Sequence, residues 1–237
     1  MLEKLKDIAK DVIKLAIDNN AEQVSLSLAN SNSFQIDVRN KKIESLQESG
    51  SSGIHITVSK NKRRSTLSSN DLSLATLAPL IRSTLEAITF MGEDLFYSLP
   101  NPKLQGRAKG NLEVLDPEFS MIKPEEKIHY PFHLEELSNN KDERLRTEQS
   151  FFSDSISHIV HADSNGFLEG ESKTLYSSGI SMVADDNSNF SDEMVDSKNF
   201  SRKQTDGWYS TARYLKNLSP SEEIVNKACK RTLRKLG

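Results

Sequence analysis

The sequence is poor in several features that mark particular classes of protein. Its 237 residues hold one cysteine, Cys229, which excludes an internal disulfide framework and favours a reducing compartment such as the cytoplasm. No apolar run approaches the ~18 residues of a membrane-spanning helix, and the N-terminus mixes acids and bases from its third residue, unlike a secretory signal. The net charge of −3 gives no excess of positive charge to attract nucleic acid. These absences predict a soluble, cytoplasmic protein that binds neither membrane nor nucleic acid directly.

Motifs of catalysis and nucleotide binding are also missing, since there is no G-x-S-x-G, G-x-G-x-x-G, P-loop or HExxH. His129 and His133 have the four-residue spacing of two zinc ligands on a helix, but Pro131 stands between them and the glutamate is absent. His158 and His161 are three residues apart in a predicted strand, so their side chains would lie on opposite faces. The sequence therefore predicts no catalytic residue and no metal site in this chain.

Three other groups of side chains have a structural explanation that is favoured over a functional one. A calcium-loop spacing occurs at Asp185, Asn187, Asn189 and Asp196, but Phe190 occupies the position that needs glycine. A basic cluster consists of Lys60, Lys62, Arg63 and Arg64. It has no aromatic residues interleaved, which favours a solvated hairpin tip over a phosphate or RNA site. Cys229 lies deep in a predicted helix, where packing is favoured over nucleophilic chemistry.

Alternation of apolar and polar residues predicts strands in the first part of the chain. The apolar positions of three such runs are Val24, Leu26 and Leu28, then Phe34, Ile36 and Val38, then Ile54, Ile56 and Val58. Turns are predicted at residues 30–33, 39–42, 50–53 and 60–62, where Asn, Ser, Gly and Lys gather. Amphipathic helices are predicted over residues 2–19 and from Leu74 to Ile88, the second capped by Asp71 or Ser73. This first module, residues 1–100, is therefore a helix, an antiparallel meander and a helix.

The second module, residues 112–237, repeats this order after a proline- and glycine-rich linker at 98–118. A charged helix is predicted over roughly 124–143, and strands follow at Phe151, 158–161 and 175–184. Residues 185–206 are predicted as a polar loop. The segment 219–222 (SPSE) predicts a capping box with proline at the first position of the last helix. The predicted class is α+β, with two modules of antiparallel β-sheet flanked by amphipathic helices, and a shared topology that suggests duplication.

Arg39, Trp208 and Tyr209 are the candidate binding residues. The adjacent aromatic residues and a fork-shaped cation suit contacts with an extended peptide, which could add a strand to an open sheet edge. The alternative for the aromatic pair is core packing with the indole N–H and the phenol hydroxyl satisfied.

Five segments resemble the PmbA (TldE) branch of the TldD/PmbA metalloprotease family. They are VRNKKIES at 38–45, SGIHITVSKNKRRSTLSSNDLS at 52–73, HADSNGF at 161–167, DGWYSTAR at 206–213 and ACKRTLRKLG at 228–237. In this order they extend over nearly the whole chain. Lys41 stands where the family usually has glycine, and Thr205 stands before Asp206 where it usually has arginine.

The resemblance implies cytoplasmic proteins that assemble as pairs. In this family the TldD-type subunit carries a zinc-binding HExxxH-type motif and cuts peptides, whereas the PmbA-type subunit lacks the motif and supports it. An older name is modulator of DNA gyrase. The catalytic or pseudo-catalytic part of both is a C-terminal domain, and this chain ends about where that domain would begin. No HExxxH occurs here, so no catalytic or metal residue is implied, and zinc is expected only in a TldD-type partner.

Three hypotheses for the function remain. The first is a non-catalytic N-terminal portion or subunit of a PmbA (TldE)/TldD-type cytoplasmic zinc metalloprotease system, which degrades peptides or unfolded proteins. It would act by binding extended substrate and by assembling with a TldD-type subunit, or with itself. The second is a stand-alone peptide- or protein-binding module with no protease partner. The third, an unrelated enzyme using scattered His and Asp residues, has the least support because no spacing brings a nucleophile to a base.

Overall fold

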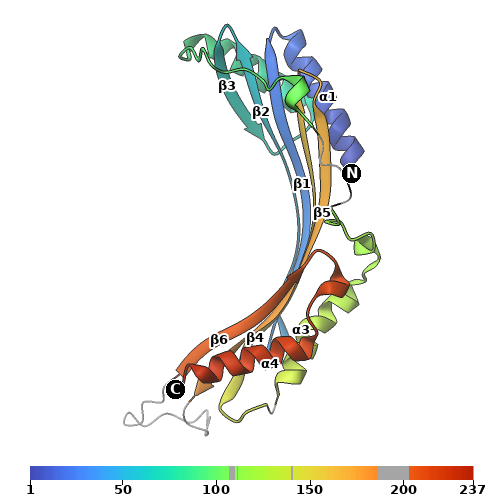
Figure 1. Cartoon of the computed structure of the whole chain (residues 1–237), viewed down its shortest axis with the longest axis vertical. Helices are drawn as coiled ribbons and strands as arrows, with labels where there is room; N and C mark the ends of the chain where they lie inside the picture. The colour runs from blue at the N-terminus through green and yellow to red at the C-terminus, as the bar shows by residue number, and fades with distance from the viewer. Residues whose placement is uncertain (107–109, 111, 140, 186–202, 237) are drawn as a thin grey trace. The chain divides into compact units, whose positions relative to one another are not determined.

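A computed structural model describes residues 1–106, 110, 112–139, 141–185 and 203–236, and confirms the α+β class. Two helix–meander–helix sequences follow each other along the chain (Figure 1). The first is α1 (Leu2–Asp18), β1 (Gln23–Arg39), β2 (Lys42–Lys60), β3 (Arg63–Ser69) and α2 (Leu74–Ala87). The second is α3 (Pro124–Ser138), β4 (Leu145–Asp163), β5 (Leu168–Asp185), β6 (Lys203–Ala212) and α4 (Ser221–Arg234). The topological repeat predicted from the sequence is therefore present.

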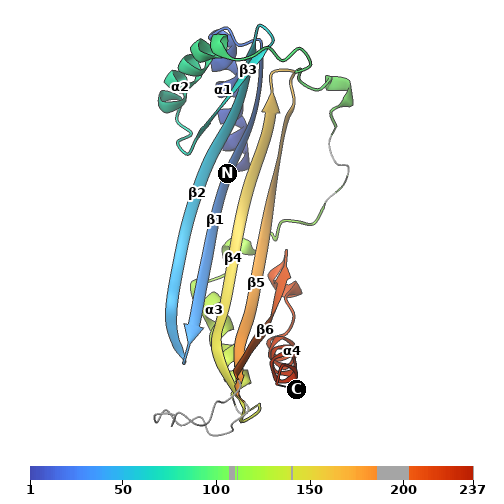
Figure 2. The same cartoon turned by 90° about the vertical axis from the view of Figure 1, so that its left-hand side faces the viewer.

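The two meanders form one antiparallel sheet with the strand order β3-β2-β1-β4-β5-β6 (Figure 2). The chain divides into two compact units. Unit 1 comprises Met1–Asn32, Gly50–Glu113 and Ile156–Lys173, and unit 2 comprises Ser33–Ser49, Val114–Ser155 and Thr174–Gly237. Four strands are 17 to 19 residues long and contribute to both units. The modules 1–100 and 112–237 thus describe the order along the chain, whereas each unit combines strand segments from both modules.

The core of unit 1 lies between the sheet and the helices α1 and α2. Every second residue of β1 from Val24 to Leu28, and of β2 from Ile54 to Val58, faces it, as the alternation predicts, and α1 contributes one stripe of its surface. The fully buried members include Ala9, Val12, Val24, Ile56 and Leu77.

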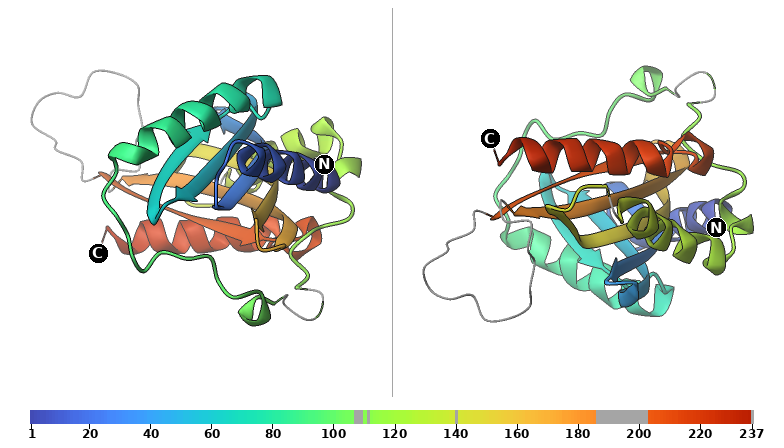
Figure 3. Two further views of the ribbon diagram at one scale, coloured as in Figure 1. Left: turned by 90° about the horizontal axis from the view of Figure 1, so that it is seen from above. Right: turned by 90° about the horizontal axis from the view of Figure 1, so that it is seen from below.

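The core of unit 2 lies between the sheet and the helices α3 and α4, which pack against each other (Figure 3). One cluster joins Ile180 and Met182 of β5 to Val225 and Ala228 of α4. The other surrounds Phe152 of β4, with Ile36 and Val38 of β1. Both helices therefore cover the same face of this part of the sheet, and the opposite face is called the open face of unit 2 below.

Two predicted turns are wrong, because β1 and β2 run without a break through residues 30–33 and 50–53. These small polar residues pair across the strands instead of turning the chain. The Asn30 Nδ2 donates to Ser52 Oγ at 2.9 Å, and the hydroxyls of Ser33 and Ser49 lie 2.9 Å apart. Such cross-strand contacts stabilise the extended backbone and override the local turn propensity.

The other two predicted hairpins are confirmed. Asn40 and Lys41 link β1 to β2 with φ of 52° and 58°, and Asn61 and Lys62 link β2 to β3 with φ of 50° and 57°. Positive φ at both central residues defines a type I′ turn, whose twist matches that of the strands. Lys41 adopts this conformation although glycine would do so at lower cost.

The last helix begins differently from the prediction. Pro220 is its N-cap residue, with no side-chain cap, so neither the capping box nor the first-turn proline is present. Ser219 instead donates its N–H to Ser210 Oγ of β6 at 3.0 Å. Ser73 caps α2 as predicted. In the part of the chain that the structure describes, no helix is long and apolar enough to cross a membrane.

Candidate functional site

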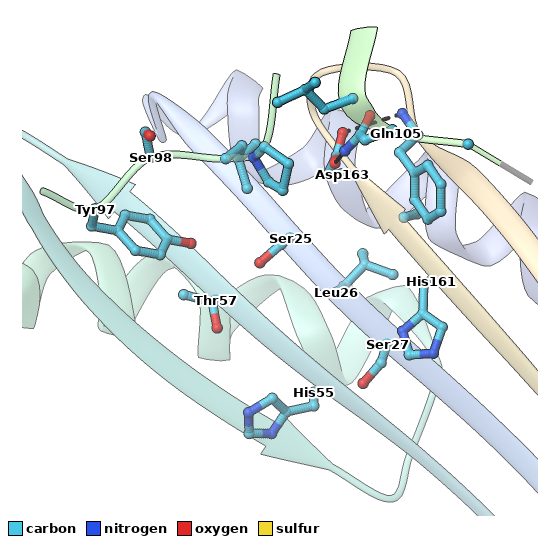
Figure 4. A pocket seen from close by; sticks show the side chains of 16 residues that line it. Ser25, Leu26, Ser27, His55, Thr57, Tyr97, Ser98, Gln105, His161 and Asp163 are labelled. Carbon is cyan, nitrogen blue, oxygen red and sulfur yellow. Dashed lines mark hydrogen bonds between the residues drawn. The ribbon is translucent and has the colours of Figure 1, made fainter. Parts of the chain in front are cut away.

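A cavity of about 660 Å³ lies on the sheet of unit 1 (Figure 4). Polar side chains from three neighbouring strands form its floor: Ser25 and Ser27 of β1, His55 and Thr57 of β2, and His161 of β4. They occupy the strand positions between the core residues and therefore face away from α1 and α2. The floor thus offers hydroxyls and imidazoles, which can donate or accept hydrogen bonds.

The segment 97–106 forms the wall of this cavity and is fixed by hydrogen bonds. Leu99 donates its N–H to Gln23 Oε1 at 3.1 Å, and the Gln105 amide donates to the Asp163 carboxylate. That carboxylate also accepts the backbone N–H groups of Asn165 and Phe167. Asp163 is therefore a structural anchor at the β4–β5 turn, with three donors on its two oxygens.

His158 and His161 lie in different surroundings. His161 lines the cavity, whereas His158 is hydrogen-bonded through Nδ1 to Ser172 Oγ at 2.7 Å. Burial lowers the pKa of His158, and the charge of the N-terminal amine lowers it further. The two side chains therefore lie on opposite faces of β4, as their odd spacing predicts.

In unit 2 the structure separates the two aromatic binding candidates. Trp208 packs against the cluster of Ile180 and Met182, and the cations of Lys227 and Arg231 lie 5.2 and 5.3 Å from its ring centre. Tyr209 is 63% exposed and lies on the open face of unit 2. β6 and α4 lie side by side (Figure 1). The pair therefore does not form a single platform, because Trp208 packs toward α4 and only Tyr209 is exposed to a ligand.

Arg39 lies apart from both aromatic residues. It is exposed at the end of β1 and pairs with Glu44 at 3.6 Å. Two strands, β4 and β5, lie between β1 and β6 in the sheet. The three predicted binding residues are therefore not brought together into one site.

Tyr209 lies beside a glycine and a second aromatic ring. It is the strand partner of Gly179 on β5. A Cβ placed at Gly179 would be 2.6 Å from Tyr209 Cβ and 2.7 Å from Phe151 Cε1. Real carbon atoms do not approach so closely, so glycine at this position allows the tyrosine and phenylalanine to flank an open strip of backbone.

β6 is an edge strand, paired with β5 over residues 203–212. Part of its backbone is already occupied by α4. Lys235 Nζ donates to the Thr205 carbonyl at 2.9 Å, and the Thr232 hydroxyl, which donates to the Ala228 carbonyl at 2.8 Å, also lies 3.3 Å from the Asp206 carbonyl oxygen. Side chains that occupy an edge reduce its tendency to pair with another chain. Among the described residues, the segment 208–212 is the part of β6 left for an added strand, because the Gly207 N–H already donates to Asp206 Oδ1 at 2.8 Å.

A second edge lies on β2. The strand β3 pairs with β2 only from Ile54 onward, and β3 is at the end of the sheet. Within the described residues of unit 2, the segment 42–49 of β2 therefore has a neighbour on one side only, β1. It is exposed along almost its whole length and includes Ile43 and Leu46, two apolar side chains in contact with water.

Asp116 anchors the chain that leaves the linker and was missed by sequence reasoning. It is 6% exposed, and its Oδ2 accepts the Tyr176 hydroxyl at 3.1 Å and the Leu215 N–H at 3.0 Å. Its Oδ1 accepts the Glu118 N–H at 3.0 Å. Burial and the neighbouring carboxylate raise the pKa of Tyr176 well above its usual value. An Asp followed by Pro117 reads as a turn, so the sequence carried no signal for these distant partners.

A buried ion pair in unit 2 was also missed. Lys127 Nζ lies 2.6 Å from Asp154 Oδ2, and 5.0 and 5.3 Å from the ring centres of Phe34 and Phe119. Burial raises the pKa of Asp154, and the Lys127 ammonium opposes that shift. With rings on two sides, the ammonium is held by cation–π attraction as well as by the carboxylate, which suits a structural role.

Neither histidine pair has a third potential metal ligand beside it among the described residues. His129 and His133 stack with ring centres 5.4 Å apart, on the helix α3, which continues through Pro131. Across the described residues, no group of three His, Cys, Asp or Glu side chains could hold a metal ion. Of the calcium-loop residues, Asp185 ends β5, and the others lie outside the described residues. The absence of zinc from this chain stays a prediction.

The two remaining candidates are Cys229, which is packed in the core, and the basic cluster, in which two arginines form ion pairs. Cys229 is 9% exposed, with Sγ 3.6 Å from Met182 Sδ, and burial raises the pKa of its thiol. In the basic cluster, Arg63 and Arg64 pair with Glu93 at 3.2 Å and with Asp94 at 3.4 Å. Neither group has the exposed, activated chemistry of a catalytic site.

Comparison with known protein families identifies the class of protein to which this chain belongs. Residues 24–88 match the PmbA/TldA metallopeptidase domain 1, and residues 117–236 match the PmbA/TldA metallopeptidase central domain. These two matches cover most of the chain. The chain therefore belongs to the PmbA/TldD metallopeptidase family and carries its first and central domains.

Two relatives bear the PmbA name. The metalloprotease PmbA homolog of Buchnera aphidicola is 26% identical over 235 residues, which are 98% of this chain and 49% of that protein. The metalloprotease PmbA of Escherichia coli O157:H7 is 20% identical over 99% of this chain and 50% of that protein. The chain spans about half the length of these relatives.

Solved structures share the fold. A protein of Bacteroides thetaiotaomicron, named as a candidate modulator of DNA gyrase, has a TM-score of 0.84 and 22% identity over 99% of this chain and 51% of that one. TldE from Thermococcus kodakarensis has a TM-score of 0.75 and 15% identity over 95% of this chain and 47% of that one. The resemblance inferred from the five segments is confirmed.

Proposed function

We propose that this chain is the non-catalytic N-terminal portion of a PmbA (TldE)-type subunit in a cytoplasmic zinc metalloprotease system. It binds extended or unfolded polypeptide and assembles with a TldD-type subunit or with a second copy of itself, and the partner supplies the zinc. The observation that carries the proposal is the match to the first and central PmbA/TldA domains, in a chain whose described residues offer no three-ligand metal cluster.

The open face of unit 2 supports the binding part of the proposal. An extended peptide pairs with an edge through its backbone, and this requires little of its sequence. The segment 208–212 of β6 offers such an edge, with the exposed Tyr209 ring beside the bare backbone at Gly179. Trp208 contributes from the other face by fixing β6 to α4. Arg39 offers a cation near the second edge, residues 42–49 of β2.

Binding is tested with a fluorescein-labelled, reduced and carboxymethylated casein, by fluorescence anisotropy. We expect saturable binding that weakens about tenfold in Tyr209→Ala, because an exposed aromatic anchor contributes on the order of 1–2 kcal/mol to such contacts. Phe96→Ala is the matched control, since Phe96 is an exposed aromatic residue of unit 1. Equal affinities of all three proteins would remove Tyr209 from the site.

Assembly and catalysis are tested with and without a TldD-type subunit. We expect the chain alone to hold no stoichiometric zinc after dialysis and to cleave no casein, and we expect a complex with the TldD-type subunit by light scattering. One zinc retained per chain, or cleavage by the chain alone that a chelator abolishes, would contradict the proposal. A chain that binds unfolded polypeptide but no TldD-type subunit would favour the stand-alone binding module.

A further inference from the structure

Three polar side chains on the floor of the cavity in unit 1 have no hydrogen-bond partner among the described residues. They are the hydroxyls of Ser25 and Ser27 on β1 and the imidazole of His161 on β4, the neighbouring strand. All three can be reached from solvent, since His161 is exposed and both serines are half-buried. Figure 4 shows them on the same side of the sheet. The cavity therefore offers donors and acceptors that a ligand can use.

The other two polar side chains of the floor are already engaged on the far side of β2. His55 Nδ1 lies 2.8 Å from Ser68 Oγ, and the hydroxyls of Thr57 and Thr66 lie 3.0 Å apart. Both contacts join β2 to its strand partner β3. A ligand that needs hydrogen bonds would therefore find them on the β1 and β4 side of the floor.

The wall above this floor is largely apolar. Tyr97 and Phe167 bring two aromatic rings to it, and Leu99, Pro100 and Leu104 add aliphatic surface. Aromatic rings pack well against each other in offset or edge-to-face contact, and also against aliphatic groups. The cavity volume of about 660 Å³ lies within the range of sites that hold small organic ligands. An aromatic ring with a polar end thus matches an apolar wall over a polar floor.

The charges around the cavity favour a neutral ligand. Its described lining residues include no lysine or arginine, and Arg64, 4.9 Å from the Tyr97 ring centre, is paired with Asp94 at 3.4 Å. The one carboxylate of the lining is Asp163, two residues from His161 on the same face of β4, and it disfavours an anion by repulsion. It is buried and already accepts three donors, so little of it is left to hold a cation. A charged ligand would lose water without gaining a counter-ion.

We propose that this cavity binds a phenol group, the side chain of a tyrosine in a polypeptide. The ring packs against the apolar wall, and its hydroxyl bonds to His161 and to the serine hydroxyls of the floor. A hydroxyl suits this floor because an imidazole donates at one nitrogen and accepts at the other, and a serine hydroxyl does either. A phenylalanine ring would fit the wall but would cover these polar groups and deprive them of water. The proposal rests on the function proposed above, since it names a side chain that the bound polypeptide contributes.

The ring resonances of His161 and Tyr97 report on the floor and on the wall, and ¹H–¹³C spectra follow them during titration with three probes. N-acetyl-tyrosine amide carries the phenol on a peptide backbone, N-acetyl-phenylalanine amide lacks the hydroxyl, and p-cresol is the phenol without a backbone. We expect a saturable shift of both rings with the tyrosine amide, and an affinity about fivefold above that of the phenylalanine amide, because one net hydrogen bond is worth about that factor. We expect p-cresol to bind more weakly than the tyrosine amide. Equal or tighter binding of p-cresol would assign the site to a free phenol and overturn the polypeptide as its source.

His161→Phe keeps a ring on the floor and removes both nitrogens, so the tyrosine and phenylalanine amides should then bind with nearly equal affinity, as followed through the Tyr97 ring. His129→Phe, which changes an exposed histidine of α3 in unit 2, is the matched control and should keep the fivefold ratio. No saturable shift with the tyrosine amide, equal affinities of the two amides in the original chain, or an unchanged ratio in His161→Phe would each overturn the proposal. Casein binding tests the proposed function separately, because a chain that binds the tyrosine amide but no casein would refute that function and leave this site standing.

Discussion

Gly179 controls how closely β6 lies against β5, and Gly179→Ala tests this directly. An added methyl would lie 2.6 Å from Tyr209 Cβ, 2.7 Å from Phe151 Cε1 and 2.9 Å from the Trp208 carbonyl oxygen. The Phe151 ring can rotate, but Tyr209 Cβ and Trp208 O are fixed to β6. The methyl therefore fits only if β6 moves away from β5, which disturbs the strand that carries Tyr209.

The expected cost follows from these contacts. Overpacking a filled site costs about 1–3 kcal/mol, and two contacts to backbone-fixed atoms place Gly179→Ala in the upper half of that range. At about 1.4 kcal/mol per factor of ten, the ratio of folded to unfolded protein falls roughly 30- to 150-fold.

Urea unfolding followed by tryptophan fluorescence measures this cost, because Trp208 is the single tryptophan of the chain and lies on β6. Gly106→Ala is the control, since a Cβ there would meet nothing within 4 Å. It should change the free energy of unfolding by less than about 0.5 kcal/mol. If Gly179→Ala were as stable as the control, with unchanged Trp208 emission, the close approach of β6 and the reasoning from it would be wrong.

Three further predictions concern single side chains. Lys127→Ala leaves Asp154 buried without its cation and should cost about 3–5 kcal/mol in urea unfolding, whereas Lys230→Ala, on the exposed side of α4, should cost almost nothing. The pKa of Asp206 is lowered, first by the Gly207 N–H and then by Lys235 and Arg231. The contribution of this carboxylate to folding stability is therefore complete above its unfolded pKa and is lost as pH falls through its folded pKa. Asp206→Asn should lose less stability than the original chain on acidification below about pH 4, as measured by urea unfolding. Cys229 should react with a thiol reagent far more slowly in the native chain than in urea, because its thiol is buried and its pKa is raised; equal rates would show that the helix packs differently.

The elements that sequence predicts well are those with a local cause. The alternation in β1 and β2 follows from one buried and one exposed face, and the asparagines at 40 and 61 mark type I′ turns because asparagine tolerates positive φ. Local reasoning failed at 30–33 and 50–53, where turn-forming residues are held extended by contacts across the two strands. It failed again at Pro220, where the chain enters α4 through a contact of Ser219 with β6.

Local sequence reasoning predicted the surroundings of the candidate site residues less well than it predicted the strands and turns. Trp208 and Tyr209 are adjacent in sequence and therefore point to opposite faces of β6, a consequence of strand parity that assigning β6 would have revealed. The partners of Glu135 and Asp116 could not be foreseen. Glu135 meets Lys41 across 94 residues, and Asp116 meets Tyr176 across 60. Only the tertiary structure brings such residues together, and a buried carboxylate carries no sequence signal that separates it from an exposed one.

Binding of unfolded polypeptide is the most direct test of the proposed function. Labelled, carboxymethylated casein is titrated with the chain alone and with the chain plus a TldD-type subunit, and fluorescence anisotropy is recorded. We expect saturable binding that Tyr209→Ala weakens and Phe96→Ala leaves unchanged. An anisotropy that stays flat in both titrations, with a chain that is folded by circular dichroism, would contradict it.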